Sequence, residues 1–506
     1  MNAVPLNNGL KGFCVFTLII WSAFGCSRVK VNAKLDTPTE FQELKESSHS
    51  LSTTSSYVST DDPWWRSLDD PSLSELIEGM FSSNLQLAQA RERVIQMRAV
   101  ATQSGSQRWP SLSLDLGWSR TKQLNPFSRL SSGGGTAMST AGMGPPSSGL
   151  PSSFTQDNFR ASLAVSYEVD VWGRIGSLTE AAERDAVASA ADLKSMAITL
   201  SANAVDIYLQ LIESQRRLAI IENQLQDDED QLKIVMNRFT QGLSPQIEVL
   251  QQTQQRDQTH AQIPPLRALL STLMRRMAAL RGEPRLAETF NVPDRLPKRP
   301  ALPSLGLPAS ALESRPDIQA AYARLRAADA RVSAAVSARL PALRLGTSAG
   351  YQSFEFNELF DNFIWNLTGN LITPLFQGGR LKAEQIRVEA VLRERLLALR
   401  ERFIIAYHEV ENALSDEKNA AEQLLRIKAQ LRSAEALFES AQRRYLTGVG
   451  DFLTTLTARK GLYVSQLASL SAERSALSAR VQLHRALGGG WVDRLTEAVG
   501  ESDLTR

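Results

Sequence analysis

A run of apolar residues spaced alternately by four and three positions extends through residues 392–445. No proline follows Pro374, so nothing interrupts the helix that this spacing predicts. Its apolar positions are Leu392, Leu396, Leu399, Phe403, Ala406, Val410, Ala413, Ala420, Leu424, Ile427, Leu431, Ala434, Phe438, Ala441 and Tyr445. A 3.5-residue spacing over this many turns, broken at Glu417 alone, is typical of helices that wind around neighbours. Counted from Arg380, such a helix would be roughly 100 Å long.

The same pattern occurs earlier in the chain, with Arg174 at the position equivalent to Arg380. Its apolar positions are Leu193, Ala197, Leu200, Ala204, Ile207, Leu211, Leu218, Ile221, Leu225, Leu232, Val235 and Phe239, with Ser214 and Asp228 as polar exceptions. Each run ends before a glycine at which a left-handed residue would stop a helix. A second helical pattern follows each glycine, at 246–281 and 452–487. The chain is therefore predicted to be a tandem duplication of long helical hairpins.

Residues 1–25 have the features of a secretory signal peptide. Lys11 precedes a short apolar segment, and small residues lead up to Cys26. A cysteine at the cleavage point resembles a bacterial lipobox, in which the thiol is acylated, so Cys26 is expected to carry lipid; a plain signal peptide is the alternative. Ser27 resembles the residue at this place in lipoproteins sorted to the outer membrane. Residues 26–61 are polar and rich in Ser and Thr, and are expected to form a lipid-anchored tether.

Four segments with a two-residue period lie between the helical patterns, at about 111–120, 160–172, 342–352 and 362–373. In the first segment the even positions are Leu, Leu, Leu and Trp, and the odd positions are Ser, Asp and Gly. Each has roughly the 9–11 residues of a tilted membrane-spanning strand with one apolar face. An ordinary half-buried sheet gives the same alternation. The export signal and the lack of another long apolar run favour the membrane-spanning interpretation.

These patterns divide the chain into two repeats, each with two strands and one helical hairpin, at 174–282 and 380–487. The expected segments are a first repeat at 62–284, a Pro-rich connector at 285–308, a second repeat at 309–490 and a C-terminal tail at 491–506. Four strands cannot close a membrane barrel, because open edges leave unpaired backbone groups in lipid. Since eight strands is the usual minimum, two or more chains must share one barrel.

The composition and the isolated motifs exclude several other classes. A net charge of +2 does not favour a nucleic-acid binder driven by gross charge, and 22% charged residues are too many for a helical membrane protein. Residues 346–350 fit G-x-S-x-G, but Ser348 lies inside an alternating strand rather than at a strand-to-helix turn, so no enzyme is expected. The four histidines are scattered, so no metal site is expected. The acidic run at 227–230 is interpreted as a solvated helix face rather than a cation site.

Six motifs occur in order between residues 60 and 495. They are DPxL at 70–73, SYEVDVWGR at 166–174, RPDI at 315–318, PLFQGGR at 374–380, EVENAL at 409–414 and ALGGGW at 486–491. Together they resemble the TolC-like outer-membrane efflux family, most closely its NodT/OprM-type lipoprotein branch. The resemblance implies a homotrimer in which a twelve-stranded outer-membrane β-barrel continues into an α-helical periplasmic tunnel.

The resemblance also implies a function and partners. The chain would be the outer-membrane channel component of a tripartite efflux system, passing drugs or other small molecules to the outside. An inner-membrane pump of the resistance-nodulation-division type and a periplasmic adaptor would deliver them, with no cofactor besides the lipid at Cys26. The exit duct of a protein secretion system is the alternative, because the same tube serves both. An exported coiled-coil spacer or adhesin would explain the helices but not the four strands.

The resemblance places the functional residues at the periplasmic hairpin tips. It implies adaptor-docking turns at Gly242, Leu243, Ser244, Gly448, Val449 and Gly450. Leu453 matches a gate leucine of the family, whereas Thr457 and Lys460 stand where the family has an acidic residue and an arginine. Asp451 is the nearby acid that could complete the gate ring. The alternative for Leu453 is an ordinary packing residue between helices.

Overall fold

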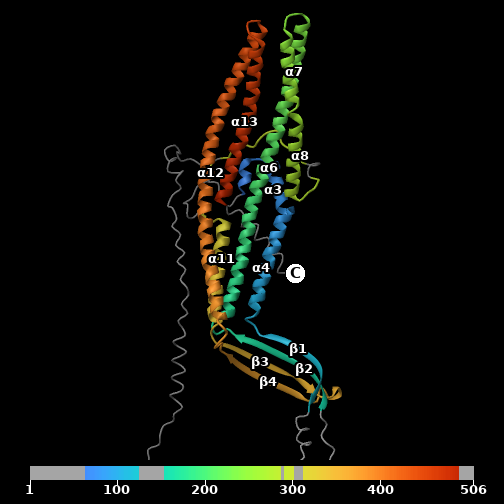
Figure 1. Cartoon of the computed structure of the whole chain (residues 1–506), viewed down its shortest axis with the longest axis vertical. Coiled ribbons are helices and arrows are strands. Elements are labelled where there is room, and N and C mark those ends of the chain that lie inside the picture. The colour runs from blue at the N-terminus through green and yellow to red at the C-terminus, as the bar shows by residue number, and fades with distance from the viewer. Residues whose placement is uncertain (1–62, 125–152, 286–289, 301, 303–311, 489–506) are drawn as a thin grey trace, which may run out of the picture. The chain divides into compact units, whose positions relative to one another are not determined.

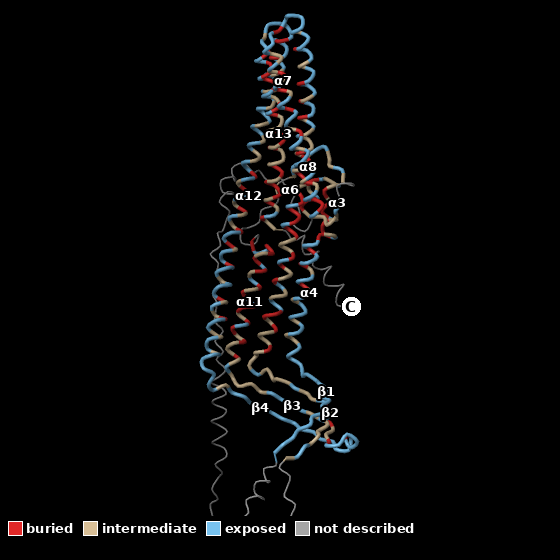
Figure 2. Tube along the Cα trace, turned by 45° about the vertical axis from the view of Figure 1, so that its right-hand side comes forward, coloured by how far each residue is buried: buried red, intermediate tan, exposed pale blue. Residues whose placement is uncertain are grey.

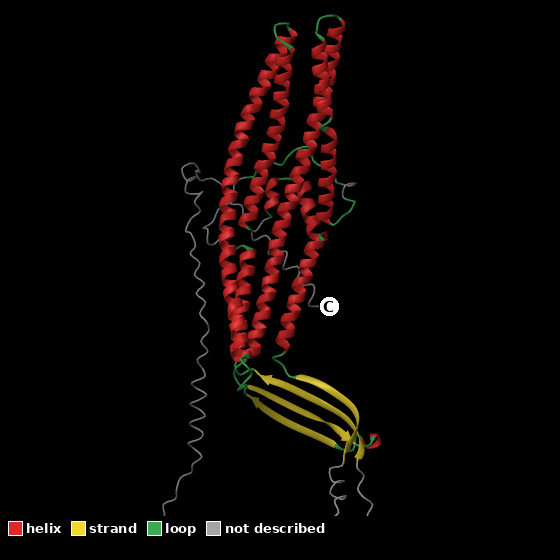
Figure 3. Ribbon diagram, viewed as in Figure 1, coloured by secondary structure: helices red, strands yellow, loops and turns green. Residues whose placement is uncertain are grey.

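A computed structural model of the chain contains long helices and one four-stranded sheet (Figures 1 and 3). It describes all residues except 1–62, 125–152, 286–289, 301, 303–311 and 489–506. Cys26, the expected signal peptide and tether and the C-terminal tail therefore lie outside the described residues, as do residues 286–289, 301 and 303–308 of the Pro-rich connector.

The chain divides into two compact units. The helical unit comprises residues 1–97, 184–326 and 393–506, and the sheet unit comprises residues 98–183 and 327–392. The helices are η1 Trp64–Leu68, α3 Pro71–Ser83, α4 Leu85–Ser106, α6 Arg174–Thr240, α7 Gln246–His260, α8 Ile263–Arg281, α11 Pro316–Ser337, η2 Phe356–Glu358, α12 Arg380–Leu446 and α13 Phe452–Leu487. Long helical hairpins from a tandem repeat, together with four strands, confirm the expected fold class.

The 67-residue helices α6 and α12 begin at equivalent positions of the two repeats. Most of their periodic apolar positions are buried or partly buried, because the 3.5-residue spacing keeps one stripe against neighbouring helices. The polar exceptions Ser214, Asp228 and Glu417 are buried as well. By length and composition α6 could cross a membrane, but 61% of its most apolar window is buried inside the protein, as in a core helix.

Two expectations about the first hairpin are wrong. The helix expected over 246–281 is two helices, α7 and α8, separated at Ala261 and Gln262. Pro264 and Pro265 cause the break, because neither has an N–H to donate to the preceding turn, whereas both fit the first turn of a new helix.

The second expectation concerned the acidic run at 227–230. It is solvated at three positions, but Asp228 is fully buried.

The sheet is antiparallel with strand order β1-β2-β3-β4. Its strands are β1 Ser111–Leu124, β2 Ser153–Val169, β3 Ala342–Ser353 and β4 Phe363–Ile372. β1 and β2 extend further toward their connecting loop than expected. β2 also stops before the expected residue 172, because residues 170–172 leave the sheet to form the junction with α6.

The register gathers the apolar residues on one face of the sheet. Partners on this face are Leu112↔Val165, Leu114↔Leu163, Trp118↔Phe159, Leu343↔Leu371 and Ala349↔Trp365. The opposite face carries Ser113↔Ala164, Asp115↔Ser162 and Ser348↔Asn366. Many apolar side chains are exposed, among them Trp118 at 63% and Leu367 at 72%, and Figure 2 shows β1 and β4 exposed along their length. An apolar face of this extent needs a cover, such as lipid.

Candidate functional site

Both hairpin turns are built around a glycine in the left-handed conformation, Gly242 at φ 75° and Gly448 at φ 79°. In each, the residue after the glycine donates its N–H to a carbonyl at the end of the preceding helix: Leu243 to Arg238 at 2.8 Å, and Val449 to Arg444 at 3.0 Å. This bond closes the last helical turn. A Cβ on either glycine would meet nothing within 4 Å, so the positive φ, rather than crowding, requires glycine. The expected left-handed residues are therefore confirmed.

The two turns each present one exposed apolar side chain. Leu243 is 65% exposed in the first turn and Val449 is 73% exposed in the second. Ser244 is buried instead, and its Oγ donates to Glu248 Oε2 at 2.6 Å. A Cβ on Gly450 would lie 3.0 Å from atoms of the preceding helix end, so the close approach of the backbone favours glycine there. The turns therefore combine a fixed backbone with two exposed apolar residues.

Asp451 caps the first turn of α13. Its Oδ1 accepts from the Thr454 N–H at 2.6 Å, and its Oδ2 accepts from the Thr454 hydroxyl at 2.7 Å. The backbone bond in particular holds the pKa of Asp451 below its usual range. The carboxylate is thus engaged within its own helix.

The residues matched to the gate share one exposed face of α13. Leu453, 58% exposed, is followed at spacings of four and three by Thr457 and Lys460, which are exposed as well. Thr457 Oγ1 donates to the Leu453 carbonyl at 2.8 Å, so it bonds to its own helix. Within one chain Leu453 therefore does not pack in a helical seam.

The opposite face of α13 packs against both long helices. Phe452 and Leu456 form a cluster with Val235 of α6 and Tyr445 of α12. The Arg238 guanidinium lies 5.0 Å from the centre of the Tyr445 ring, a cation–π contact. These contacts join the two hairpins directly beneath their turns.

A second link between the hairpins was not predicted from the sequence. Tyr463 of α13 donates its hydroxyl to Asp227 of α6, and Arg459 Nη2 donates to Gln231 Oε1 at 3.1 Å. The two bonding positions on each helix are separated by about one turn, so the bonds lie one above the other. In the sequence, the only available signal for this link was the four-residue spacing of these polar residues on each helix. That spacing does not indicate which helix is the partner.

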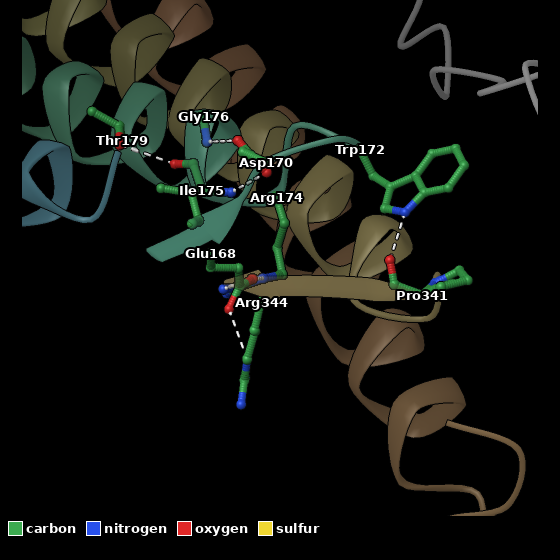
Figure 4. A network of polar contacts seen from close by, with 9 residues as sticks. All are labelled: Glu168, Asp170, Trp172, Arg174, Ile175, Gly176, Thr179, Pro341 and Arg344. Atoms are coloured by element: carbon green, nitrogen blue, oxygen red, sulfur yellow. Dashed lines mark hydrogen bonds and ion pairs between the residues drawn. The ribbon is translucent and has the colours of Figure 1, made fainter. Parts of the chain in front are cut away.

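The SYEVDVWGR motif builds the junction between β2 and α6 (Figure 4). Asp170 accepts from the N–H groups of Ile175 at 3.1 Å and Gly176 at 2.6 Å, which caps the new helix. Trp172 Nε1 donates to the Pro341 carbonyl at 2.7 Å, tying the junction to the start of β3. The motif therefore fixes where the sheet ends and the helix begins.

The glutamate of the same motif holds two arginines. Glu168 Oε1 lies 2.6 Å from Arg174 Nη2, and its Oε2 lies 3.4 Å from Arg344 Nε on β3 (Figure 4). The equivalent junction of the second repeat has Leu375 and Phe376, exposed at 93% and 89%. The first junction thus contains an ion-pair network, whereas the second leaves two apolar residues almost fully exposed.

Buried Arg315 connects three of the sequence motifs. It contacts Asp317 at 2.8 Å, Glu409 of EVENAL at 2.6 Å and the carbonyl of Ala486 at 2.8 Å. Burial opposes the guanidinium charge, but the two carboxylates raise the pKa of Arg315 on balance. These motifs hold α11, α12 and α13 together, which is a structural role rather than a catalytic one.

Comparison with known proteins identifies the family. A sequence model described as outer membrane efflux protein matches residues 76–283 and 307–489, more than half of the chain. The chain belongs to the outer membrane efflux protein family. As a member of this family it is an outer-membrane channel component of an efflux system, which confirms the expected family and general function.

Individual relatives of this outer membrane efflux protein agree with that assignment. The pyoverdine export outer membrane protein OpmQ of Pseudomonas putida is 33% identical over 432 residues, covering 85% of this chain and 88% of the relative. The toluene efflux pump outer membrane protein TtgF of Pseudomonas putida is 29% identical and covers 85% of each chain. The solved structure of the outer-membrane channel OprN superposes with a TM-score of 0.78 at 26% identity, covering 90% of this chain and 98% of that one.

Proposed function

We propose that three copies of this chain form one outer-membrane channel that releases drugs or other small molecules. A periplasmic adaptor and an inner-membrane pump of the resistance-nodulation-division type would deliver them. The observation that carries the proposal is the four-stranded sheet, whose apolar face is exposed and whose two edges have no strand partner among the described residues. Lipid covers such a face, and further copies complete such edges.

The hairpin tips are proposed as the regulated end of the channel. Leu453 from each copy forms an apolar constriction that water and ions cross poorly. The exposed Leu243 and Val449 offer the adaptor two apolar contacts on rigid turns. On the face of α13 that carries Leu453, the next two positions are Thr457 and Lys460, neither of which is acidic, and the nearby carboxylate of Asp451 is engaged as the cap of its helix.

The substrate class rests on the relatives. OpmQ exports pyoverdine and TtgF belongs to a toluene efflux pump, so both are named for small molecules. Small-molecule export can be tested in a host that lacks its own efflux channels. This host would carry the adaptor and pump genes that neighbour the gene of this chain. Adding the chain should lower the accumulation of a fluorescent dye. Unchanged accumulation together with restored secretion of a reporter protein would instead assign the protein to a secretion system.

The anchor is proposed at Cys26, where the thiol carries fatty acid. Changing Cys26→Ser should abolish incorporation of labelled fatty acid into the protein, because no other residue supplies the acylated thiol after cleavage. The variant still inserts through its strands, so outer-membrane fractions should contain it. Label that persists on the variant would disprove lipidation at this residue.

A further inference from the structure

All four strands of the sheet join helices at the same end. β1 and β3 follow α4 and α11, and β2 and β4 lead into α6 and α12 (Figure 1). The opposite end carries the β1–β2 and β3–β4 connections. In the proposed channel the long helices lie in the periplasm, so this opposite end, here called the outer end, reaches the outer leaflet of the membrane.

A row of aromatic side chains crosses the apolar face of the sheet near the outer end. Trp118 of β1 is paired with Phe159 of β2. Tyr351 of β3 is paired with Phe363 of β4. Phe356, from the β3–β4 connection, packs edge-on against Phe159 with ring centroids 5.5 Å apart. Aromatic side chains in such a row mark the level at which hydrocarbon gives way to lipid headgroups.

Arg120 and Lys122 lie beyond the aromatic row, on the same side of β1. The pairing of β1 with β2 is continuous from 111 to 124, so both side chains share the face of Trp118. Trp109, 75% exposed just before β1, is nine residues from Trp118, which is roughly 23 Å along the membrane normal for a strand tilted by about 40°. Because the apolar band of membrane barrels is about 25 Å tall, the two cations fall in the outer headgroup layer.

Asp157 of β2 fixes the first of these cations. Its Oδ1 accepts from Arg120 Nε at 2.9 Å and its Oδ2 accepts from Arg120 Nη2 at 2.8 Å, while Oδ1 also accepts from Trp118 Nε1 at 3.2 Å. The Arg120 side chain is still 62% exposed, and its Nη1 has no acceptor among the described residues. Lys122 is exposed and has no ion-pair partner in the part of the chain that the structure describes. The two cations lie about 7 Å apart along the strand, both open to an added anion.

The charges at the outer end are divided between the two strand hairpins. Among the described residues, the first hairpin carries Arg120 and Lys122, whereas the β3–β4 connection carries Glu355, Glu358 and Asp361. β3 is two strands away from β1 in the sheet. Within one copy, an anionic group is therefore attracted to the first hairpin and not to the second.

We infer that the outer end of the β1–β2 hairpin binds a phosphorylated glycolipid of the outer leaflet, of the lipid A type. Lys122 and Nη1 of Arg120 donate to a phosphate group, since ammonium and guanidinium groups form strong charge-assisted bonds with phosphate. The acyl chains cover Leu114 and Leu116, which are 63% and 71% exposed on the same face of β1. This continuous apolar surface below the cations selects a lipid over free phosphate. The inference rests on the proposed channel, in which the outer end meets the outer leaflet.

Binding of fluorescent lipid A to the purified full-length protein in detergent tests this site. Lipid A without its phosphates and phosphatidylglycerol are the comparison lipids. The variants are Lys122→Gln, Lys122→Gln combined with Arg120→Gln, and Lys122→Arg, which keeps the charge. Arg160→Gln is the matched control, because Arg160 is exposed next to the aromatic row but lies on the opposite, polar face of the sheet. Thermal unfolding should be unchanged in Lys122→Gln, since this side chain has no partner to lose.

Lys122→Gln should weaken the binding of lipid A about fivefold and the double variant should weaken it further, because each cation near an anionic lipid surface contributes about this factor. Lys122→Arg and Arg160→Gln should bind as the wild type does, and lipid A without phosphates should bind the wild type as weakly as lipid A binds the double variant. Equal affinities of the wild type and the double variant would overturn the site, as would an equal loss in Arg160→Gln. Phosphatidylglycerol bound as tightly as lipid A, or displacement of lipid A by inorganic phosphate, would overturn the choice of a glycolipid.

The binding measurement needs neither adaptor nor pump, so it separates this site from the proposed function. If the substitutions do not change lipid A binding although the wild type lowers dye accumulation, the lipid site is wrong and the proposed function stands. If binding depends on the two cations but the wild type does not lower dye accumulation, the proposed function fails by itself.

Discussion

At the scale of single residues, burial and backbone geometry decide which positions respond to acidification or substitution. His484 of α13 stacks on Trp64, with ring centroids 5.4 Å apart, inside the helical unit. Burial, with a contribution from the nearby Arg480 charge, lowers the pKa of His484 from 6.5 to about 4. The folded protein therefore keeps this imidazole neutral at pH values at which the unfolded chain protonates it.

Acidification should consequently weaken the helical unit through His484. Its contribution is fully present above pH 6.5 and is lost as the pH falls through about 4, since the unfolded state binds the proton first. The free energy of unfolding should fall by an amount on the order of 3 kcal/mol once the pH is below both pKa values. Thermal unfolding of the wild type and of His484→Gln at pH 7.5 and 4.5 measures it, and the variant should lose less stability on acidification. The exposed His260→Gln is the control. An equal loss of thermal stability between pH 7.5 and pH 4.5 in all three proteins would contradict this account.

The turn glycine Gly448 should tolerate no side chain. Gly448→Val forces a β-branched residue to φ 79°, at a cost of about 1–3 kcal/mol. Drug export and cross-linking to the adaptor should fall, while trimers persist on native gels. Gly461→Ala on α13 is the control, since its Cβ would meet nothing within 4 Å and its φ is helical. Unaltered resistance in Gly448→Val would count against a role for this turn.

At the scale of elements, one buried polar layer distinguishes the first helical hairpin from the second. In the first hairpin Asp228 accepts from the Thr259 hydroxyl at 2.7 Å, and Gln252 donates to the Asp228 carbonyl oxygen at 2.9 Å. The equivalent positions of the second hairpin are all small or short: Ala434, Ala458, Gly461 and Ser465. A buried polar residue in a helical seam favours one register, so the first hairpin is held more firmly than the second.

Removing this carboxylate should loosen the first hairpin. Asp228→Ala takes away the acceptor 2.7 Å from the buried hydroxyl of Thr259 and the longer contact of the carboxylate with the Gln255 amide, whereas the bond of Gln252 to the main-chain carbonyl remains. The loss should cost about 1–3 kcal/mol of the free energy of unfolding. Amide hydrogen exchange should accelerate in α7 more than in α13. Asp230→Ala, in the exposed part of the same acidic run, should change stability by less than about 0.5 kcal/mol. Equal effects of the two substitutions would show that the buried layer does not hold the hairpin.

Most helices and strands could be predicted, because the pattern that indicates each one lies within its own residues. The 3.5-residue spacing of α6 and α12 and the alternation in the strands are local signals, and Gly242 and Gly448 mark their ends. The break before Ile263 was missed although Pro264 and Pro265 were visible, because the helical periodicity continues across it. The burial of Asp228 could not be predicted, since its partners lie on another helix, beyond the hairpin turn.

At the scale of the whole molecule, the sequence predicted which segments meet the membrane and which form the tips, but not how the tips are held. The links from Tyr463 to Asp227 and from Arg238 to Tyr445 join helices that are far apart in the chain. Their residue types are common on helix surfaces, so no local pattern distinguishes them. Leu453 was identified by resemblance, and the fold places it on a face of α13 that its own chain leaves exposed.

Single-channel conductance of the reconstituted protein tests the central claim most directly. If Leu453 lines the constriction of a channel, Leu453→Ala widens it, and the open-channel conductance should rise while thermal stability stays near that of the wild type. The control Leu250→Ala removes an equally exposed leucine from α7 and should leave conductance unchanged. A Leu453→Ala protein with lower thermal stability and wild-type conductance would contradict the account, as would a wild-type protein that forms no pores.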